Sequence, residues 1–306
     1  MKINTVTGSV DVADLGTTFI HEHIICSSPE FMQAFHPRWN DPAKVVPDAV
    51  EKLKYVKDRY GVTTIVDGTP LSLGRDLELL KRVSEESGVY IIASTGFYTG
   101  ECFTVNSTPP EILADWMIDE ILNGAVKPAF LKCAFEYDIT PYQQRVIQIL
   151  SLVMKATGLP VFAHTHAKRK TGLQVLDEFA KYDIPFHKII IGHTADALTA
   201  EYPLDLLERG AWVSVDRLHR ESFAPKAQVA VELIQKGWEK KLFLAHDGIC
   251  YMDCANVLHG EGWNTAVDRL GVIHEGVLPY LRDAGIKEES IRTILQENVQ
   301  TLFADR

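Results

Sequence analysis

Residues 17–23 read TTFIHEH, an apolar and β-branched run that ends in two histidines. Seven further runs of this kind follow along the chain, at residues 62–66, 89–94, 128–133, 159–163, 188–191, 211–215 and 241–245. Such near-continuous apolar strands predict a parallel sheet that is buried on both of its faces.

Segments with helical periodicity lie between these runs. Apolar residues recur at helical spacing over 50–60, 77–83 and 112–121, and Thr140 followed by Pro141 predicts the start of another helix. Eight alternating units in 306 residues favour an α/β fold of the (β/α)8 TIM-barrel type. An open sheet of about seven strands would give a similar pattern and stays as the alternative. Because no linker-like stretch divides the chain, we expect a single domain over residues 1–306.

The composition is that of an ordinary globular protein. The chain has 31 Lys+Arg, 41 Asp+Glu, 46% hydrophobic residues and a formal net charge of −10, which excludes a disordered chain and disfavours a nucleic-acid partner. No apolar run is long enough to span a membrane, and the first residues lack the apolar stretch of a signal peptide. The five cysteines are scattered, which argues against a disulfide framework. We therefore expect a cytoplasmic protein with no membrane or nucleic-acid partner.

Two histidines close the first predicted strand. His21 and His23 are two residues apart, so both imidazoles face one side of the strand while Glu22 points to the other. Further side chains that can bind a metal lie at or near the ends of later strands: Lys132, His164, His193 and Asp247. The C-terminal ends of barrel strands meet at one mouth, where active sites form. These six residues are therefore the predicted metal ligands.

The remaining histidines are interpreted as structural. His246 should point to the opposite side of its strand from Asp247. His166 shares the strand parity of His164, which makes it a candidate for a contact next to the metal ligands rather than a ligand. The others are His36, His187, His219, His259 and His274.

Lys132 lies inside an apolar run, where a lysine is rarely buried without a partner. Two nearby divalent cations would lower its pKa and leave a neutral amine, which can take up carbon dioxide as a carbamate. The carbamate is an anionic, carboxylate-like group that can bridge two metal ions. A lysine whose ammonium group reaches the rim of the barrel is the alternative interpretation.

Several segments resemble the phosphotriesterase family of the amidohydrolase superfamily, including its branch of phosphotriesterase-like lactonases. They cover nearly the whole chain and read IHEHIICSS, TIVDGTP, ASTGFYTG, AFLKCAFEYDITP, FAHTHA, IIIGHTAD, VSVDR and LAHDGICYMD. The resemblance implies a (β/α)8 barrel with a binuclear metal centre.

The resemblance also implies a role for each ligand. The set divides into His21, His23 and Asp247 for the more buried ion, His164 and His193 for the more exposed ion, and a carbamylated Lys132 that bridges both together with a hydroxide. Some relatives use a glutamate as the bridge, but Glu136 lies four residues beyond the matching position. The two divalent ions are expected to be zinc, with cobalt, manganese and iron as the alternatives.

In the lactonase branch, a tyrosine after the third strand and an arginine after the seventh orient the substrate. Tyr98 in TGFYT and Arg217 in VDRLH occupy these positions, although each could also serve only in packing or in an ion pair. The long segment 248–270 contains Trp263, and relatives line their acyl-chain pocket with a tryptophan of this segment. An ungapped count from Pro279 places that tryptophan near Asp268 instead.

The predicted centre fits hydrolysis of an ester-like bond, with Asp247 as the group that orients the hydroxide and carries a proton to the leaving group. The resemblance favours a lactonase for N-acyl homoserine lactones, with weak hydrolysis of organophosphates. The alternatives are a true phosphotriesterase, a lactonase for a phosphorylated sugar lactone bound by Lys168, Arg169, Lys170 and Arg220, and a barrel that only binds ligands. Because family members are commonly homodimers, we expect a homodimer.

Overall fold

The eight predicted strand runs form one parallel sheet that curls into a barrel. The computed structural model describes residues 1–36, 39, 41–252 and 270–304. Within these residues the paired strands follow one another in chain order: β3 (Thr17–Cys26), β4 (Val62–Asp67), β5 (Tyr90–Gly96), β6 (Phe130–Phe135), β7 (Val161–Thr165), β8 (Ile189–Ile191), β9 (Trp212–Val215) and β10 (Leu242–Leu244). A ninth strand, β11 (Gly248–Met252), lies on the free side of β3. The barrel prediction is confirmed, and the open-sheet alternative is wrong.

The ring closes through an interrupted eighth strand. β10 pairs with β9, whereas β11 pairs with β3 in the parallel register Gly248↔Glu22. The break between them contains Asp247, whose amide donates to the carbonyl oxygen of His21 at 3.1 Å. The interruption, which the apolar pattern did not predict, turns Asp247 out of the regular strand geometry at the mouth of the barrel.

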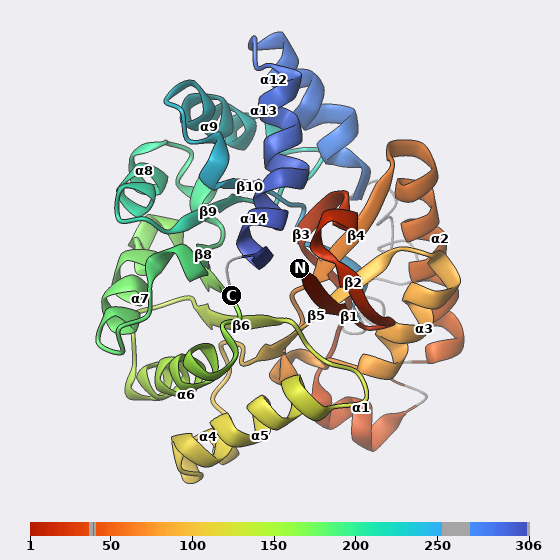
Figure 1. Ribbon diagram of the computed structural model, residues 1–306, viewed down its shortest axis with the longest axis vertical. Helices are drawn as coiled ribbons and strands as arrows, with labels where there is room; N and C mark the ends of the chain where they lie inside the picture. The colour runs from red at the N-terminus through yellow and green to blue at the C-terminus, as the bar shows by residue number, and fades with distance from the viewer. Residues whose placement is uncertain (37–38, 40, 253–269, 305–306) are drawn as a thin grey trace.

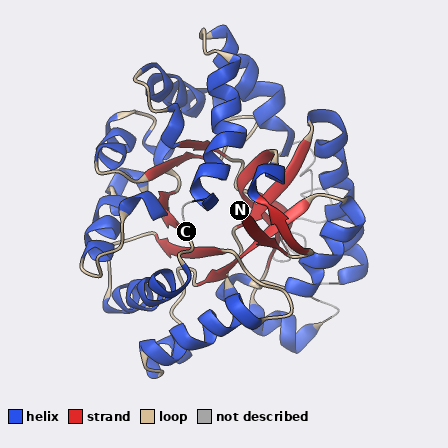
Figure 2. Cartoon of the chain, viewed as in Figure 1, coloured by secondary structure: helices blue, strands red, loops and turns tan. Residues whose placement is uncertain are grey.

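Helices surround the strands on the outside (Figures 1 and 2). The predicted helical segments lie inside α2 (Pro42–Tyr60), α3 (Leu77–Ser87), α5 (Pro110–Asn123) and α6 (Pro141–Thr157). The Thr140 hydroxyl accepts from the Gln143 amide, and the Gln143 side chain accepts from the Thr140 amide, so α6 begins with a capping box. The other α-helices of the described residues are α1 (Pro29–Phe35), α4 (Phe103–Ser107), α7 (Thr171–Ala180), α8 (Glu201–Glu208), α9 (Phe223–Gln235), α12 (Leu278–Asp283), α13 (Glu288–Arg292) and α14 (Asn298–Ala304).

The two ends of the chain cover the N-terminal end of the barrel. The first residues form an antiparallel hairpin, β1 (Lys2–Thr5) and β2 (Gly8–Asp11), that the sequence analysis did not predict. Gln296 donates to the Thr17 hydroxyl at 2.9 Å, and Asn298 at the start of α14 donates to the Leu242 carbonyl at 2.7 Å. Figure 1 shows α14 in front of the strand ring, near both termini. The C-terminal ends of the strands are therefore the mouth that holds the polar side chains.

None of the described helices combines the length and apolar character that a bilayer crossing requires.

Candidate metal centre

The mouth of the barrel brings all six predicted ligands into one cluster. The closest distances between their ligand atoms are His21 Nε2–Lys132 Nζ 2.6 Å, His164 Nδ1–His193 Nε2 2.8 Å, His23 Nε2–Asp247 Oδ1 3.2 Å, His21 Nε2–Asp247 Oδ1 3.4 Å and His193 Nε2–Asp247 Oδ2 4.0 Å. The four histidines and Lys132 are buried. Residues from β3, β6 and β7, from the turn after β8 and from the break after β10 thus converge on one volume.

Three residues of this region adopt a backbone conformation that side chains other than glycine rarely take. His193, Arg217 and Asp247 have φ values of 60°, 54° and 52°. Left-handed conformations of this kind persist only where the surrounding contacts hold them, and they gather at functional sites. Each of the three follows the end of a strand, and the turn directs its side chain into the mouth.

The His23 imidazole is held in one tautomer. The Thr69 hydroxyl donates to the Ile25 carbonyl at 3.2 Å, so towards His23 Nδ1, at 2.8 Å, it acts as an acceptor. In the neutral imidazole the proton therefore lies on Nδ1, and Nε2, which faces the Asp247 carboxylate, is the nitrogen left for a metal ion. A neutral imidazole whose other nitrogen is hydrogen-bonded in this way is the usual form of a metal ligand.

His164 and His193 present two bare nitrogens to each other. The Asp216 carboxylate accepts from His193 Nδ1 at 2.7 Å, and the Glu136 carboxylate accepts from His164 Nε2 at 2.5 Å. The remaining nitrogens, His193 Nε2 and His164 Nδ1, are 2.8 Å apart. Two lone pairs at this separation repel unless a proton or a metal ion is shared between the two nitrogens. The chemistry of the donor set therefore fits a bound metal ion.

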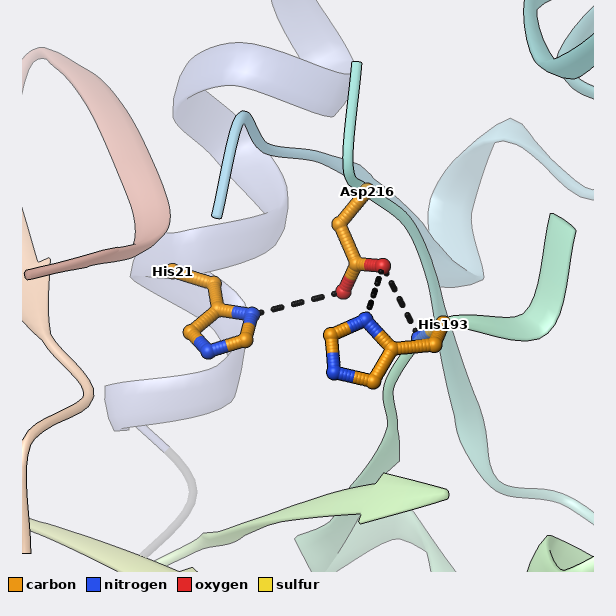
Figure 3. Close-up of side chains that lie close together, drawn as sticks. All are labelled: His21, His193 and Asp216. Atoms are coloured by element: carbon orange, nitrogen blue, oxygen red, sulfur yellow. Dashed lines mark hydrogen bonds and ion pairs between the residues drawn. The ribbon is translucent and has the colours of Figure 1, made fainter. Parts of the chain in front are cut away.

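Asp216 is a functional residue that the sequence analysis did not identify. It is fully buried, and it also reaches His21, whose Nδ1 lies 3.4 Å from Oδ2 (Figure 3). Burial alone would raise the pKa of Asp216, but His193 and His21 hold that pKa well below its usual range. One carboxylate thus orients two of the candidate ligands, His193 and His21. The only sequence signal was an acidic residue at the end of the apolar run WVSV.

Burial keeps two of the ligands neutral. It lowers the pKa of His21 to about 3, with a further contribution from Lys132, and it lowers the pKa of His164 to about 4, with a contribution from His193. Burial also opposes charge on His23, but Cys26 and Asp247 outweigh it and raise the pKa of His23 to about 10. Without a metal ion His23 would therefore hold a second proton on Nε2, which faces Asp247, and a metal cation would replace that proton.

Lys132 is fully buried and has no carboxylate partner within 4.0 Å among the described residues. Its Nζ lies 4.4 Å from the centroid of the Phe162 ring. Burial lowers the pKa of Lys132 to about 8, although Asp247 and Asp216 oppose the shift. At pH 7 about a tenth of such an amine is neutral, which is the form that reacts with carbon dioxide. The alternative interpretation, an ammonium group at the rim, is wrong.

Glu22 and His246 point away from the cluster, as predicted, and meet each other on the outer side. The Glu22 carboxylate accepts from the His246 amide at 3.0 Å, from His246 Nδ1 at 2.8 Å and from the Gly248 amide at 2.8 Å. These donors come from the residues on either side of Asp247. Glu22 therefore holds the break in the eighth strand, and with it the position of Asp247.

Replacement of this carboxylate gives the first testable prediction. In Glu22→Gln, the amide group would face the same three donors, and at least one of them would lose its acceptor. We expect the free energy of unfolding in urea to fall by about 2 kcal/mol. Glu86→Gln, on the exposed face of α3, is the matched control and should change the stability by less than about 0.5 kcal/mol. Equal stabilities of the two variants would contradict the role of Glu22.

A glycine packs against the first two ligands. A side chain at Gly68 would place its Cβ 2.8 Å from His21 Cδ2 and 3.3 Å from His23 Cε1. Contacts this short force one of the rings to move. The TIVDGTP segment therefore supplies the Thr69 acceptor together with the space that both imidazoles need.

The two predicted substrate-orienting residues also lie at the centre. The Tyr98 hydroxyl is 3.5 Å from His164 Nδ1. Arg217 donates from Nε to Asp247 at 3.3 Å and from a terminal nitrogen to Asp196 at 2.8 Å. Arg217 therefore does not only pair with a surface carboxylate, because it links Asp247 at the centre to Asp196.

Two cavities open beside the cluster. The larger one has a volume of about 1080 Å³, and its mostly apolar wall includes Cys26, Leu71, Phe97, Trp116, Met117 and Met252. Cys26 lies three residues after His23 on β3, so the cavity extends to the strand that carries two of the candidate ligands. The smaller one, of about 490 Å³, is polar, and its wall includes Glu136, His166, Lys168, Asp196, Arg217 and Lys226. Trp263 lies outside the described residues, as does most of the segment 248–270.

Comparisons with known proteins agree with this geometry. A family model described as "Phosphotriesterase family" matches residues 1–303. A phosphotriesterase homology protein of Mycobacterium tuberculosis is 31% identical, over 99% of this chain and 97% of that protein. An aryldialkylphosphatase of Saccharolobus solfataricus is 29% identical, over 97% of each chain. The solved structure of the phosphotriesterase from Mycobacterium tuberculosis superimposes with a TM-score of 0.91 at 29% identity, over 100% of this chain and 99% of that one.

The barrel, the cluster of histidines and carboxylates at its mouth, and a family match over almost every residue agree with one another. This chain therefore belongs to the phosphotriesterase family, and it is a metal-dependent hydrolase.

Proposed function

We propose that this hydrolase opens lactones, with N-acyl homoserine lactones as the best-fitting class, and that it hydrolyses organophosphate triesters as a weaker side activity. The observation that carries the proposal is the apolar cavity of about 1080 Å³ that reaches Cys26, beside His23. A long acyl chain needs an apolar site of this size next to the reacting ring. A triester has no such chain.

The residues of the cluster divide into the two ligand groups that the family resemblance implies. In this proposal the groups are His21, His23 and Asp247 for the more buried ion, His164 and His193 for the more exposed ion, and a carbamylated Lys132 between them. When bound, a pair of divalent ions supplies Lewis acidity and makes water acidic at near-neutral pH. Imidazole and carboxylate ligands suit zinc, with cobalt, manganese and iron as alternatives.

The surrounding side chains have distinct tasks. Asp247 takes the proton of the attacking water and passes it to the leaving oxygen, the general acid–base role. Arg217 holds one Asp247 oxygen at 3.3 Å and is itself held by Asp196 at 2.8 Å, which orients the carboxylate for this transfer. Tyr98 directs its hydroxyl at the space beside His164 and would donate to an oxygen of the lactone.

A true phosphotriesterase is the second candidate, and the similarity to an aryldialkylphosphatase favours it. A phosphorylated sugar lactone has less support, because two of the three basic residues after β7 already have partners. Arg169 pairs with Asp138 at 3.6 Å and Lys170 with Asp205 at 3.1 Å. A barrel that only binds ligands has the least support, since all six ligand types are present.

Two further expectations belong to this proposal. The scattered cysteines, which argue against a disulfide framework, favour a cytoplasmic protein, and the family resemblance favours a homodimer. Gel filtration with light scattering would test the second expectation, with twice the 34.3 kDa chain mass as the expected result.

The substrate class can be tested by comparing kcat/KM for a lactone and for an organophosphate triester. We expect kcat/KM for a long-chain N-acyl homoserine lactone to exceed that for paraoxon by at least about 100-fold, or about 2.7 kcal/mol of transition-state binding. Tyr98→Phe should lower the lactone rate more than the paraoxon rate, because only the lactone uses the hydroxyl. Tyr137→Phe, at a tyrosine that is 67% exposed, is the matched control and should change neither rate. A higher rate with paraoxon, or an equal loss of both rates in Tyr98→Phe, would favour the phosphotriesterase instead.

A further inference from the structure

We infer that Glu136 is the positioning residue that holds the His164 ring for the more exposed metal ion and thereby determines how tightly that ion binds. The inference deepens the proposed function and rests on its division of the ligands between two ions. It assigns to Glu136 a task other than that of the bridging group considered from the sequence.

Glu136 contacts one edge of the His164 ring. Glu136 directly follows β6, and its Oε1 lies 2.5 Å from Nε2 of His164. His193 Nε2 lies 2.8 Å from Nδ1 of the same ring, on the other edge. Glu136 is thus on the side of His164 that faces away from the cluster, whereas Lys132 Nζ lies inside it, 2.6 Å from His21.

This contact selects which nitrogen of His164 is available. A neutral imidazole has one N–H and one bare nitrogen, and the hydrogen bond to Glu136 places the N–H on Nε2. The bare nitrogen is then Nδ1, next to His193 Nε2. Without Glu136 the proton could occupy either nitrogen and the ring could turn about its Cβ–Cγ bond. Both changes remove a ligand atom from the more exposed ion.

The other histidine ligands have equivalent acceptors, but those acceptors are buried. Thr69 serves His23 and is 1% exposed, while Asp216 serves His21 and His193 and is 0% exposed. The Glu136 side chain is 33% exposed and lines the polar cavity. The only solvent-accessible acceptor of the set, among the described residues, therefore belongs to His164. This asymmetry makes the more exposed ion the one that exchanges first.

Metal binding provides the test, with activity as a secondary readout. The wild-type chain, Glu136→Ala and Glu136→Gln would be loaded with Co²⁺, dialysed against a competing chelator and analysed for cobalt per chain. Loss of such an outer contact weakens metal binding by about 10- to 100-fold. We expect Glu136→Ala to keep about one of two ions, and Glu136→Gln to keep both because its amide oxygen still accepts from Nε2.

Thr69→Val is the matched control, because it removes the corresponding acceptor from His23. It should weaken the other, more buried ion, and anomalous diffraction from the cobalt would show which position has emptied in each variant. Melting temperatures close to that of the wild type would show that each variant is folded.

Three results would overturn the inference. The first is wild-type affinity for both ions in Glu136→Ala. The second is a loss in Glu136→Gln as large as that in Glu136→Ala, since a charge or a direct ligand, rather than an acceptor, would then hold the ion. A wild-type chain that binds fewer than two ions would overturn the proposed binuclear centre, and this inference with it.

Discussion

Lys132→Ala is expected to lose both metal ions and to lower kcat/KM by at least about three orders of magnitude, or about 4 kcal/mol. Lys132 is fully buried, and its Nζ lies 2.6 Å from a nitrogen of His21. Among the described residues, no carboxylate lies within 4.0 Å of this Nζ that could replace the lysine as a bridge. In the proposed centre, removal of the carbamylated Lys132 would leave both ions without a shared ligand. Metal content by mass spectrometry and lactone hydrolysis would be measured on the same preparation.

Rescue distinguishes a lost bridge from a damaged core. Acetate or propionate should partly restore metal binding and activity in Lys132→Ala, because a short carboxylate can fill the space of the carbamate. Lys52→Ala is the matched control, since Lys52 is also buried but pairs with Asp48 at 2.5 Å. It should lower stability and keep both ions. High-resolution density that shows a bare ammonium at Lys132 with two bound metals would contradict the carbamate.

Asp247→Asn is expected to lower lactone and paraoxon hydrolysis alike, by about 10³-fold. Asparagine keeps an oxygen that can face His21 and His23 but cannot take a proton from water. The loss should therefore be common to both substrates, in contrast to the selective effect of Tyr98→Phe. Asp247 lies 3.2 Å from His23 and 3.4 Å from His21, so weaker metal binding would add to the loss.

The measurement is kcat/KM for both substrates at saturating metal, which separates the chemical step from metal affinity. Asp76→Asn is the matched control. Asp76 caps α3 through a hydrogen bond to the Leu79 amide, and asparagine is an equally good capping residue. Its activity should stay at the wild-type level. A tenfold or smaller loss in Asp247→Asn would show that another group carries the proton.

Much of the fold was readable from local pattern. A barrel strand that is buried on both faces is apolar along its length, so each apolar run predicts a strand without information on the strands that pair with it. The capping box at Thr140 is equally local, since its partners are three residues apart. The β1–β2 hairpin was missed because each strand has only four residues, buried side chains alternate with more exposed ones in β1 and β2 is largely exposed, so no apolar run marks them.

The metal centre was likewise predicted in part, because the ligands were found and the residues that orient them were not. The six candidate ligands were found because strand ends of a parallel barrel meet at one mouth, and each ligand ends or interrupts an apolar run. The residues that orient them were not found, because their partners are distant in the chain. Asp216 and His21 are separated by 195 positions, and Glu22 and His246 by 224. No periodicity in the sequence connects such pairs.

By itself, then, the sequence determined the parallel barrel and the side chains that can bind metal, because burial and strand direction leave a local, periodic record. Only the tertiary structure decided which nitrogen of each histidine is free, that Glu22 holds the break beside Asp247, and that an apolar and a polar cavity flank the centre. Those features arise from contacts between strand ends that are far apart in the chain. A tautomer depends on the position of one acceptor atom, and that position exists only once the barrel has closed.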